Sequence, residues 1–376
     1  MKILQLAKLP PSTYGGIEKL VNQLSIILFS KNSRCDTLCF ENNKKSSFEV
    51  FNTHTVYKAR SLFQFQSTSF SIHHLYFLLK LRDSYDSFHL HLPNPLACLY
   101  LLIFFPKRKY LTIHYHACTN YKRFFWINYQ IEKPILKRAK NIISTSKSLS
   151  NSPSLKLYKK KISVIPLNLS DSDFNEPNIS NCSNQVQSII KAKKYIVFVG
   201  RLVKYKNFPV LLHAFYRSLF PEYNLLIIGN GPEVDKIRAL ISKLKMMENV
   251  YLFHSIDNNE KRALFSFAKF SVLASTSSAE AFGYVQLESM AMGTPVLSFD
   301  IPFSGVGEVN KNMETGIVVK RSNRDDLCIS NLSQAMLLLK KDKKLLKRIS
   351  VGAKKRSILF KESKIVPKYR KFFLLN

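Results

Sequence analysis

The sequence predicts an α/β protein with two doubly wound domains, each built on a parallel sheet. Three observations predict this fold class: a length of 376 residues, two sets of short apolar segments that alternate with segments of helical periodicity, and a polar stretch between the sets. At about 150 residues per domain, the length suggests two domains. Hydrophobic residues make up 46% of the chain, which excludes a wholly disordered protein.

The first set of elements opens with an apolar strand at 3–6, and the loop after it contains Gly15 and Gly16. A helix should follow, because apolar residues recur there at helical spacing. Further short strands are expected at 110–113, 141–144 and 163–165. The longest apolar run, residues 96–105, is about half the roughly 20 residues of a membrane-spanning helix. We expect a buried helix there, with a one-sided membrane contact as the alternative.

Residues 167–187 are rich in Asn, Ser and Asp, and they mark the domain boundary. The second set of strands is expected at 195–199, 225–228, 250–253, 270–274 and 295–299. The expected organisation is a first domain at 1–168, a linker at 169–190, a second domain at 191–350 and a C-terminal helix at 351–376 that returns to the first domain.

The charge balance indicates a polyanionic partner. Fifty-seven Lys and Arg against 25 Asp and Glu leave a net charge of +32, and residues 1–168 alone carry 25 cations against 7 anions. Nucleic acid, an anionic bilayer and phosphorylated substrates are the candidates. Nucleic acid is disfavoured, because no helix-turn-helix, zinc-finger or ribonucleoprotein signature is present.

The cysteines and the start of the chain point to a reducing compartment. The N-terminal apolar stretch is too short for a secretory signal, so we expect free thiols rather than a disulfide framework. Cys35 and Cys39 have the spacing of a metal half-site, but no second Cys/His pair matches them. We interpret them as residues of a buried strand, with zinc as the weaker alternative.

Two cations should lie where ligands of open α/β sheets bind. Arg201 and Lys206 come directly after the expected strand 195–199, at the carboxyl edge of the second sheet. The guanidinium fork and the mobile ammonium together suit a diphosphate. Gly15 and Gly16, between a strand and a helix, would also let the backbone approach an anion, although a turn needs such glycines equally well.

Glu280 and Glu288 form the second constellation. If a helix begins near Gly283, Glu280 lies in the loop before it and Glu288 inside it. Phe282, Gly283 and Tyr284 then offer backbone N–H groups at the helix N-terminus. Two carboxylates in a cleft would accept hydrogen bonds from vicinal hydroxyls of a sugar.

Histidines follow two of the expected strands. His114 and His116 come after 110–113, and His89 and His91 end a similar segment. A general base, a hydrogen bond to a sugar hydroxyl and a structural role are all open for them. A metal site is the least favoured interpretation, because no carboxylate accompanies them at ligand spacing.

These residues resemble the family 4 retaining glycosyltransferases, which have the GT-B fold of two facing Rossmann-like domains. The resemblance rests on the Glu280–Glu288 segment and on five supporting motifs that run nearly end to end. They are Tyr14-Gly15-Gly16-Ile17-Glu18, Gly200-Arg201-Leu202 with Lys206, Ile228-Gly229-Asn230-Gly231-Pro232-Glu233, Ala291-Met292-Gly293-Thr294-Pro295-Val296 and Glu314-Thr315-Gly316. Residues 89–97 and 304–306 further resemble bacterial O-antigen mannosyl- and rhamnosyltransferases that use GDP-sugars.

The resemblance implies a role for each of these residues. Arg201 and Lys206 would hold the donor diphosphate, and Gly16, next to Gly15, would approach the phosphate by its backbone. Glu288 would bind the nucleotide ribose, Glu280 would hydrogen-bond the donor sugar, and His114 would contact that sugar. Where relatives have one His followed by Ser or Gly and Asp, this chain has His114-Tyr115-His116-Ala117.

The expected activity is transfer of a hexose, of mannose or rhamnose type, with retention at the anomeric carbon and without cofactor or metal. The acceptor would be a polyprenyl-diphosphate-linked or oligosaccharide hydroxyl. The protein would be cytoplasmic and peripheral on the anionic inner face of the bacterial cytoplasmic membrane. A UDP-sugar donor is the alternative within the fold. A nicotinamide-dependent oxidoreductase is disfavoured, because no Gly-x-Gly-x-x-Gly follows the first strand.

Overall fold

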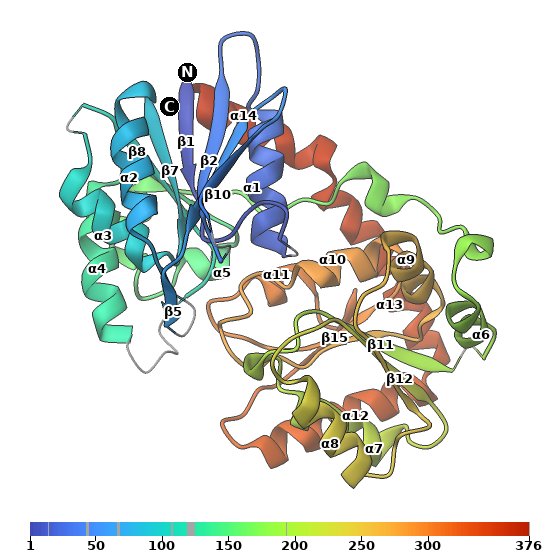
Figure 1. Cartoon of the computed structure of the whole chain (residues 1–376). Helices are drawn as coiled ribbons and strands as arrows, with labels where there is room; N and C mark the ends of the chain where they lie inside the picture. The colour runs from blue at the N-terminus through green and yellow to red at the C-terminus, as the bar shows by residue number, and fades with distance from the viewer. Residues whose placement is uncertain are drawn as a thin grey trace. The chain divides into compact units, whose positions relative to one another are not determined.

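The structure is a computed structural model of the chain, and it describes residues 1–13, 15–42, 45–65, 68–106, 108–118, 125–192 and 194–375. The chain divides into two compact units (Figure 1). Unit 1 contains Met1–Asn168 and Ile365–Asn376, and unit 2 contains Leu169–Lys364. Among the described residues, no helix combines the length and the apolar character that crossing a membrane requires.

Unit 1 is built on a sheet with the strand order β10-β9-β8-β7-β1-β2-β4-β3. Its neighbouring strands are parallel except for the edge pair β3–β4. The strands are β1 (Lys2–Leu6), β2 (Arg34–Glu41), β3 (Ser47–Val50), β4 (Thr55–Arg60), β7 (Ser87–Leu92), β8 (Tyr110–Tyr115), β9 (Asn141–Ser144) and β10 (Ile162–Val164). A separate hairpin pairs β5 (Phe63–Phe65) with β6 (Thr68–Phe70).

Helices connect these strands, as parallel pairing requires. They are α1 (Gly16–Ile27), α2 (Ile72–Leu81), α3 (Pro95–Phe104), α4 (Phe125–Arg138) and α5 (Lys147–Ser150), with the 3₁₀ turns η1 (Arg82–Ser84) and η2 (Lys156–Lys161). The last helix, α14 (Glu362–Leu375), runs beside α1 in Figure 1, and Arg370 Nε donates to the Ile27 carbonyl at 3.1 Å.

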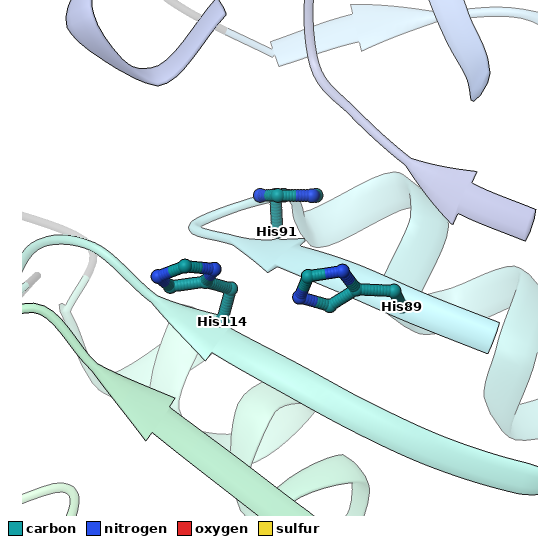
Figure 2. A group of neighbouring side chains, drawn as sticks. All are labelled: His89, His91 and His114. Carbon is teal, nitrogen blue, oxygen red and sulfur yellow. The ribbon is translucent and has the colours of Figure 1, made fainter. Parts of the chain in front are cut away.

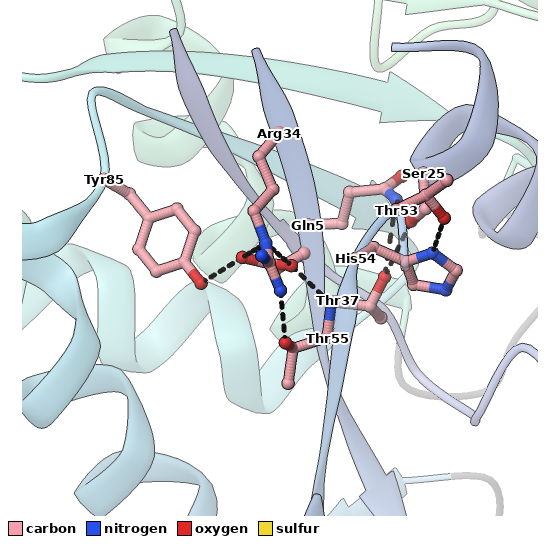
Figure 3. A network of polar contacts seen from close by, with 9 residues as sticks. Gln5, Ser25, Arg34, Thr37, Thr53, His54, Thr55 and Tyr85 are labelled. Atoms are coloured by element: carbon pink, nitrogen blue, oxygen red, sulfur yellow. Dashed lines mark hydrogen bonds and ion pairs between the residues drawn. The ribbon is translucent and has the colours of Figure 1, made fainter. Parts of the chain in front are cut away.

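A polar network ties β1 and β2 to their neighbours (Figure 3). Asp36 on β2 accepts hydrogen bonds from Arg34 Nε at 2.8 Å, from the Thr55 backbone N–H at 2.5 Å and from the Tyr85 hydroxyl at 2.7 Å. Beside it, the Gln5 amide on β1 donates to Ser25 Oγ of α1 at 2.9 Å. These bonds satisfy polar groups that the fold places in its interior.

Unit 2 is built on an all-parallel sheet with the order β13-β12-β11-β14-β15-β16. The strands are β11 (Tyr195–Val199), β12 (Asn224–Ile228), β13 (Val250–Phe253), β14 (Ser271–Leu273), β15 (Val296–Phe299) and β16 (Gly316–Val319). All of β11 is buried, as expected for a parallel strand with both faces covered.

The helices of unit 2 are α6 (Asn184–Ala192), α7 (Phe208–Ser218), α8 (Val234–Lys243), α9 (Asn258–Phe267), α10 (Tyr284–Ala291), α11 (Val306–Val309), α12 (Asp325–Lys341) and α13 (Lys343–Ser357). The 3₁₀ turns are η3 (Asp171–Phe174), η4 (Ile179–Asn181), η5 (Lys204–Lys206) and η6 (Ile358–Phe360). Val186 and Ile189 of α6 pack in one cluster with residues of β11 and α9. The polar segment 169–190 thus contributes to the core of unit 2.

The structure confirms the predicted fold class, with two Rossmann-like α/β units on parallel sheets. The strands at 195–199 and 250–253 have the predicted bounds, and Cys35 and Cys39 are buried on β2. The prediction of a buried helix at 96–105 was only half right. The helix is present as α3, but the side chains of Leu99 and Ile103 are 41% and 63% exposed, because α3 covers the sheet with one face only.

Candidate active site

The loop after β11 carries the two predicted cations of unit 2. Arg201 is exposed, and Lys206 is buried in the turn η5, with its side chain over Gly200. A Cβ at Gly200 would lie 3.6 Å from Lys206 Nζ, and the φ of Gly200 is +150°. Glycine at this position therefore gives the strand end a conformation that other residues rarely adopt.

Lys206 and Glu280 form a buried ion pair. Lys206 Nζ lies 2.6 Å from Glu280 Oε2, and the two side chains are 7% and 8% exposed. Ser275 Oγ donates to the same carboxylate oxygen at 2.6 Å. The loop after β11 and the loop before α10 lie at the same edge of the parallel sheet, where the carboxyl ends of its strands are. Lys206 and Glu280, which are 74 positions apart in the sequence, therefore meet there.

The charges of this cluster act on one another. Burial lowers the pKa of Lys206, but the negative charge of Glu280 and the hydrogen bond to it outweigh burial, so the pKa lies above its usual value. Burial raises the pKa of Tyr205, and Glu280 adds to that effect, whereas Lys206 and Arg201 oppose it. Tyr205 thus lies within the field of all three charged residues, and the structure brings Arg201, Lys206 and Glu280 together.

The second glutamate of the predicted constellation has its own cationic partner. Glu288 lies inside α10, and its Oε1 is 2.8 Å from Nζ of Lys261 on α9. The two side chains are 13% and 7% exposed. Each glutamate of the pair is therefore held by one buried lysine from a neighbouring element.

The N-terminus of α10 is shaped by Gly283. This residue caps the helix with a φ of +68°, in the left-handed region that favours glycine. Phe282 is buried, and its ring lies 6.1 Å from that of Phe360, so its side chain belongs to the core of unit 2. Tyr284 is the first residue of α10 and is half-buried.

The remaining predicted site residues belong to unit 1. Gly15 is the N-cap of α1 and Gly16 its first residue. A side chain at Gly15 would meet the Glu18 carboxylate. Tyr14, which belongs to the same motif, lies outside the described residues.

His114 is fully buried inside unit 1 and belongs to a cluster of four histidines. His89, His91, His114 and His116 are between 0% and 2% exposed. The ring centroids of His114 and His116 lie 4.2 Å apart, and the Tyr369 ring of α14 lies 6.0 Å from that of His114. Burial is the largest cause that lowers the pKa of each of these four imidazoles, and the pKa falls to about 3 for His89 and His116. All four imidazoles are therefore neutral at pH 7.

Sequence reasoning missed three partners in unit 2. Lys261 and Ser275 hold the two glutamates, and Ser304 Oγ donates to the Glu280 carbonyl at 2.5 Å. Ser304 carries a signal in the sequence, since it lies in the segment 304–306 that resembles the bacterial enzymes. Nothing in the spacing distinguishes Lys261 from the other cations of this basic chain.

Comparisons with known proteins found a matching family model and curated relatives. Residues 183–356 match the family model described as glycosyl transferases group 1. The O-antigen chain mannosyltransferase C of Escherichia coli is 26% identical over 85% of this chain and 84% of its own length. The D-rhamnosyltransferase WbpZ of Pseudomonas aeruginosa is 27% identical over 86% of this chain and 83% of its own length.

A solved structure shares the fold of the whole chain. Sucrose-phosphate synthase from Thermosynechococcus elongatus superposes with a TM-score of 0.78 and 19% identity, with all of both chains covered. At that identity the likeness concerns the fold, which is GT-B. The family match covers most of unit 2, including the loop with Arg201 and Lys206 and the helix with Glu288. Residues 183–356 therefore form a group 1 glycosyltransferase domain.

Proposed function

We propose that the protein is a retaining glycosyltransferase that moves a hexose, of mannose or rhamnose type, from a nucleotide diphosphosugar to a lipid-linked or saccharide hydroxyl. The observation that carries the proposal is the cluster after β11, in which Arg201 is exposed beside the buried pair of Lys206 and Glu280. The mannosyl- and rhamnosyltransferase relatives support the sugar class and a role in surface polysaccharide synthesis.

The chemistry required of this cluster is stabilisation of the leaving diphosphate. Negative charge grows on the diphosphate as the glycosidic bond breaks, and a preorganised cation stabilises it more than water does. Arg201 supplies a planar fork for two phosphate oxygens, and Lys206 adds a point charge. We propose that these groups and helix N-termini replace a metal ion at the diphosphate.

Glu280 and Glu288 would bind the sugar and the ribose of the donor. Both carboxylates are fixed by lysines, Glu280 by Lys206 and Glu288 by Lys261. A carboxylate held in one orientation can accept hydrogen bonds from two vicinal hydroxyls without losing further side-chain entropy. Attack by the acceptor on the face that the diphosphate leaves would give retention, with the departing phosphate as the base.

A donor panel tests this proposal. Purified protein is incubated with GDP-mannose, GDP-rhamnose, UDP-glucose, UDP-galactose and UDP-N-acetylglucosamine, together with membrane lipid extract as acceptor. Glycolipid product and its anomeric configuration are measured. A product with GDP-sugars only supports the proposal, and a product with UDP-sugars only supports the alternative donor.

The Arg201→Ala variant tests the site itself. We expect turnover to fall by about 10²–10³, the usual cost of removing one preorganised donor to a developing oxyanion. Arg217→Ala is the matched control, because Arg217 is exposed on α7 of the same unit. Equal activity of the two variants would refute the role of Arg201.

We further propose that unit 1 docks on an anionic membrane through a face formed by α2 and α3. Exposed apolar side chains on this face include Ile72 (67%), Tyr76 (58%) and Ile103 (63%). The two helices are neighbours, since the hydroxyl of Tyr100 on α3 donates to the carbonyl of Ser71, the N-cap of α2, at 2.8 Å. The cationic excess of residues 1–168 favours an anionic surface, by about 1 kcal/mol per nearby Lys or Arg.

Flotation with liposomes tests the docking face. Wild-type protein should float with phosphatidylglycerol vesicles at low salt and largely lose binding in high salt. Ile103→Glu should weaken flotation, whereas Leu338→Glu, at a 41% exposed position on α12 of unit 2, should not. Equal flotation of both variants would refute this face.

A further inference from the structure

The four clustered histidines of unit 1, His89, His91, His114 and His116, lie on one face of the sheet. In the register of β7 and β8, His91 is the partner of His114, and in a strand every second residue shares a face. His89 therefore lies on the same side as His91, and Figure 2 shows the rings of His89, His91 and His114 gathered over the two strands. One ligand nitrogen from each of these three lies within 4.8 Å of the others.

The polar atoms of this cluster are incompletely satisfied. Both ring nitrogens of His89 and of His114 are buried without a hydrogen-bond partner among the residues that the structure describes. Buried polar atoms are nearly always paired, and each exception calls for a physical reason, such as a bound ion. The aromatic rings of α14 cover the cluster, with Phe373 at 5.1 Å from His89 and Tyr369 at 6.0 Å from His114.

The hydrogen bonds of Gln5 fix the orientation of His91. The Gln5 amide nitrogen donates to the Val21 carbonyl at 3.0 Å and to Ser25 Oγ at 2.9 Å, so its oxygen faces His91. That oxygen is 3.0 Å from His91 Nε2, which must therefore carry the proton. The lone pair of a neutral His91 is then on Nδ1, 2.9 Å from His116 Nε2 and inside the cluster.

From this geometry we propose that His89, His91 and His114 bind one zinc-class divalent transition-metal ion, a role for His114 in place of the contact with the donor sugar that the resemblance implies. Neutral imidazoles suit Zn²⁺, which takes His nitrogens at about 2.0–2.1 Å. Around a tetrahedral ion such nitrogens are about 3.3 Å apart. The present separations, of up to 4.8 Å, would have to close to that value, and the broad terminal torsion of histidine permits the ring rotation that this requires.

The remaining parts of the site follow from the same contacts. The ion takes the place of the His116 N–H at His91 Nδ1, and His116 or a water molecule fills the fourth position. Gln5 is the outer partner that holds the His91 ring, as the hydrogen-bonded partners of metal-binding histidines commonly do. The ion joins β7 to β8 beneath α14, so its role is structural.

Metal binding by the full-length protein tests the proposal. The protein is dialysed against Zn²⁺ and then against metal-free buffer, and bound zinc is measured by elemental analysis. We expect about one zinc per chain, and with Co²⁺ the visible absorption of a tetrahedral nitrogen-ligated ion. His114→Phe and His89→Phe should each weaken binding at least 100-fold, and Gln5→Leu, which keeps all three ligands, about 10–100-fold.

His254→Asn is the control, because His254 is exposed in unit 2. Far-UV circular dichroism verifies that each variant is folded, and Gln5→Leu remains a test if a ligand variant is not. If the wild-type protein bound neither Zn²⁺ nor Co²⁺, the proposed metal site would be refuted, and buried water would account for the unpaired histidine nitrogens. Binding that is equal in wild type, His114→Phe and Gln5→Leu would overturn it as well. None of these measurements depends on transferase activity.

Discussion

The ion pair between Lys206 and Glu280 gives the sharpest prediction for unit 2. Its two charges lie 2.6 Å apart and are more than nine-tenths buried, so removal of one partner leaves an uncompensated charge in the interior. Breaking such a pair costs about 3–5 kcal/mol. We expect Lys206→Met to lower the free energy of unfolding by about 3 kcal/mol, because Ser275 still donates to the Glu280 carboxylate.

A double-mutant cycle separates the pair from its surroundings. Glu280→Gln leaves the Lys206 ammonium beside Arg201, and it should also be destabilising. The double variant, with neither charge, should cost less than the two single variants together, by about 1–3 kcal/mol. The assay is urea denaturation followed by far-UV circular dichroism, for the wild type, both single variants and the double variant.

The chain offers an exposed ion pair in the same unit as a control. Lys236 Nζ lies 2.9 Å from Glu233 Oε1, but the lysine side chain is 75% exposed. Lys236→Met should therefore change the free energy of unfolding by less than about 1 kcal/mol. The reasoning would be refuted if Lys206→Met were as stable as Lys236→Met. It would also be refuted if the double variant lost as much free energy of unfolding as the two single variants together.

Three further predictions concern single positions. His74 is buried with a pKa lowered to about 3 by burial, so the unfolded chain binds its proton near pH 6.5 while the folded chain does not. The free energy of unfolding should therefore fall as the pH falls from 6.5 towards 3, and His74 should contribute about 2 kcal/mol of that loss at pH 5. Urea titrations at pH 7 and pH 5 should show that His74→Phe removes this contribution. A Cβ at Gly229 would collide with the Gly200 carbonyl, so Gly229→Ala should lower the thermal midpoint, at a cost of about 1–3 kcal/mol, and an unchanged midpoint would contradict this. Lys261→Met should raise the donor KM more than it lowers kcat, because Lys261 acts through Glu288. Steady-state kinetics in which KM rises and kcat falls by the same factor would exclude that role.

The regular parts of unit 2 were predictable because their sequence patterns are local. Strand β11 is an uninterrupted apolar run between polar residues, and Gly283 marks the start of α10. The edge strand β3, its neighbour β4 and the short β16 were missed. β3 is exposed along its whole length, and its alternation of polar and apolar residues covers only four positions, which is too short to predict a strand.

The candidate site was predictable only in part. Parallel topology brings Lys206 to Glu280, and the resemblance assigned both residues. The pairing of Glu288 with Lys261 depends on how α9 packs on α10, which the spacing along the chain does not encode. The shared face of the histidines follows from their alternation, but the rings that cover them belong to α14, more than 240 residues later in the chain.

The division of unit 1 between two chain segments has a consequence for synthesis on the ribosome. Tyr369 and Phe373, which cover the histidines, emerge only after the whole of unit 2 has been made. Until then, one side of the nascent β7–β8 pair stays open to solvent, and this interval is when an ion could enter without unfolding anything. Affinity tags or truncations near residue 370 would therefore disturb the amino-terminal half of the enzyme first.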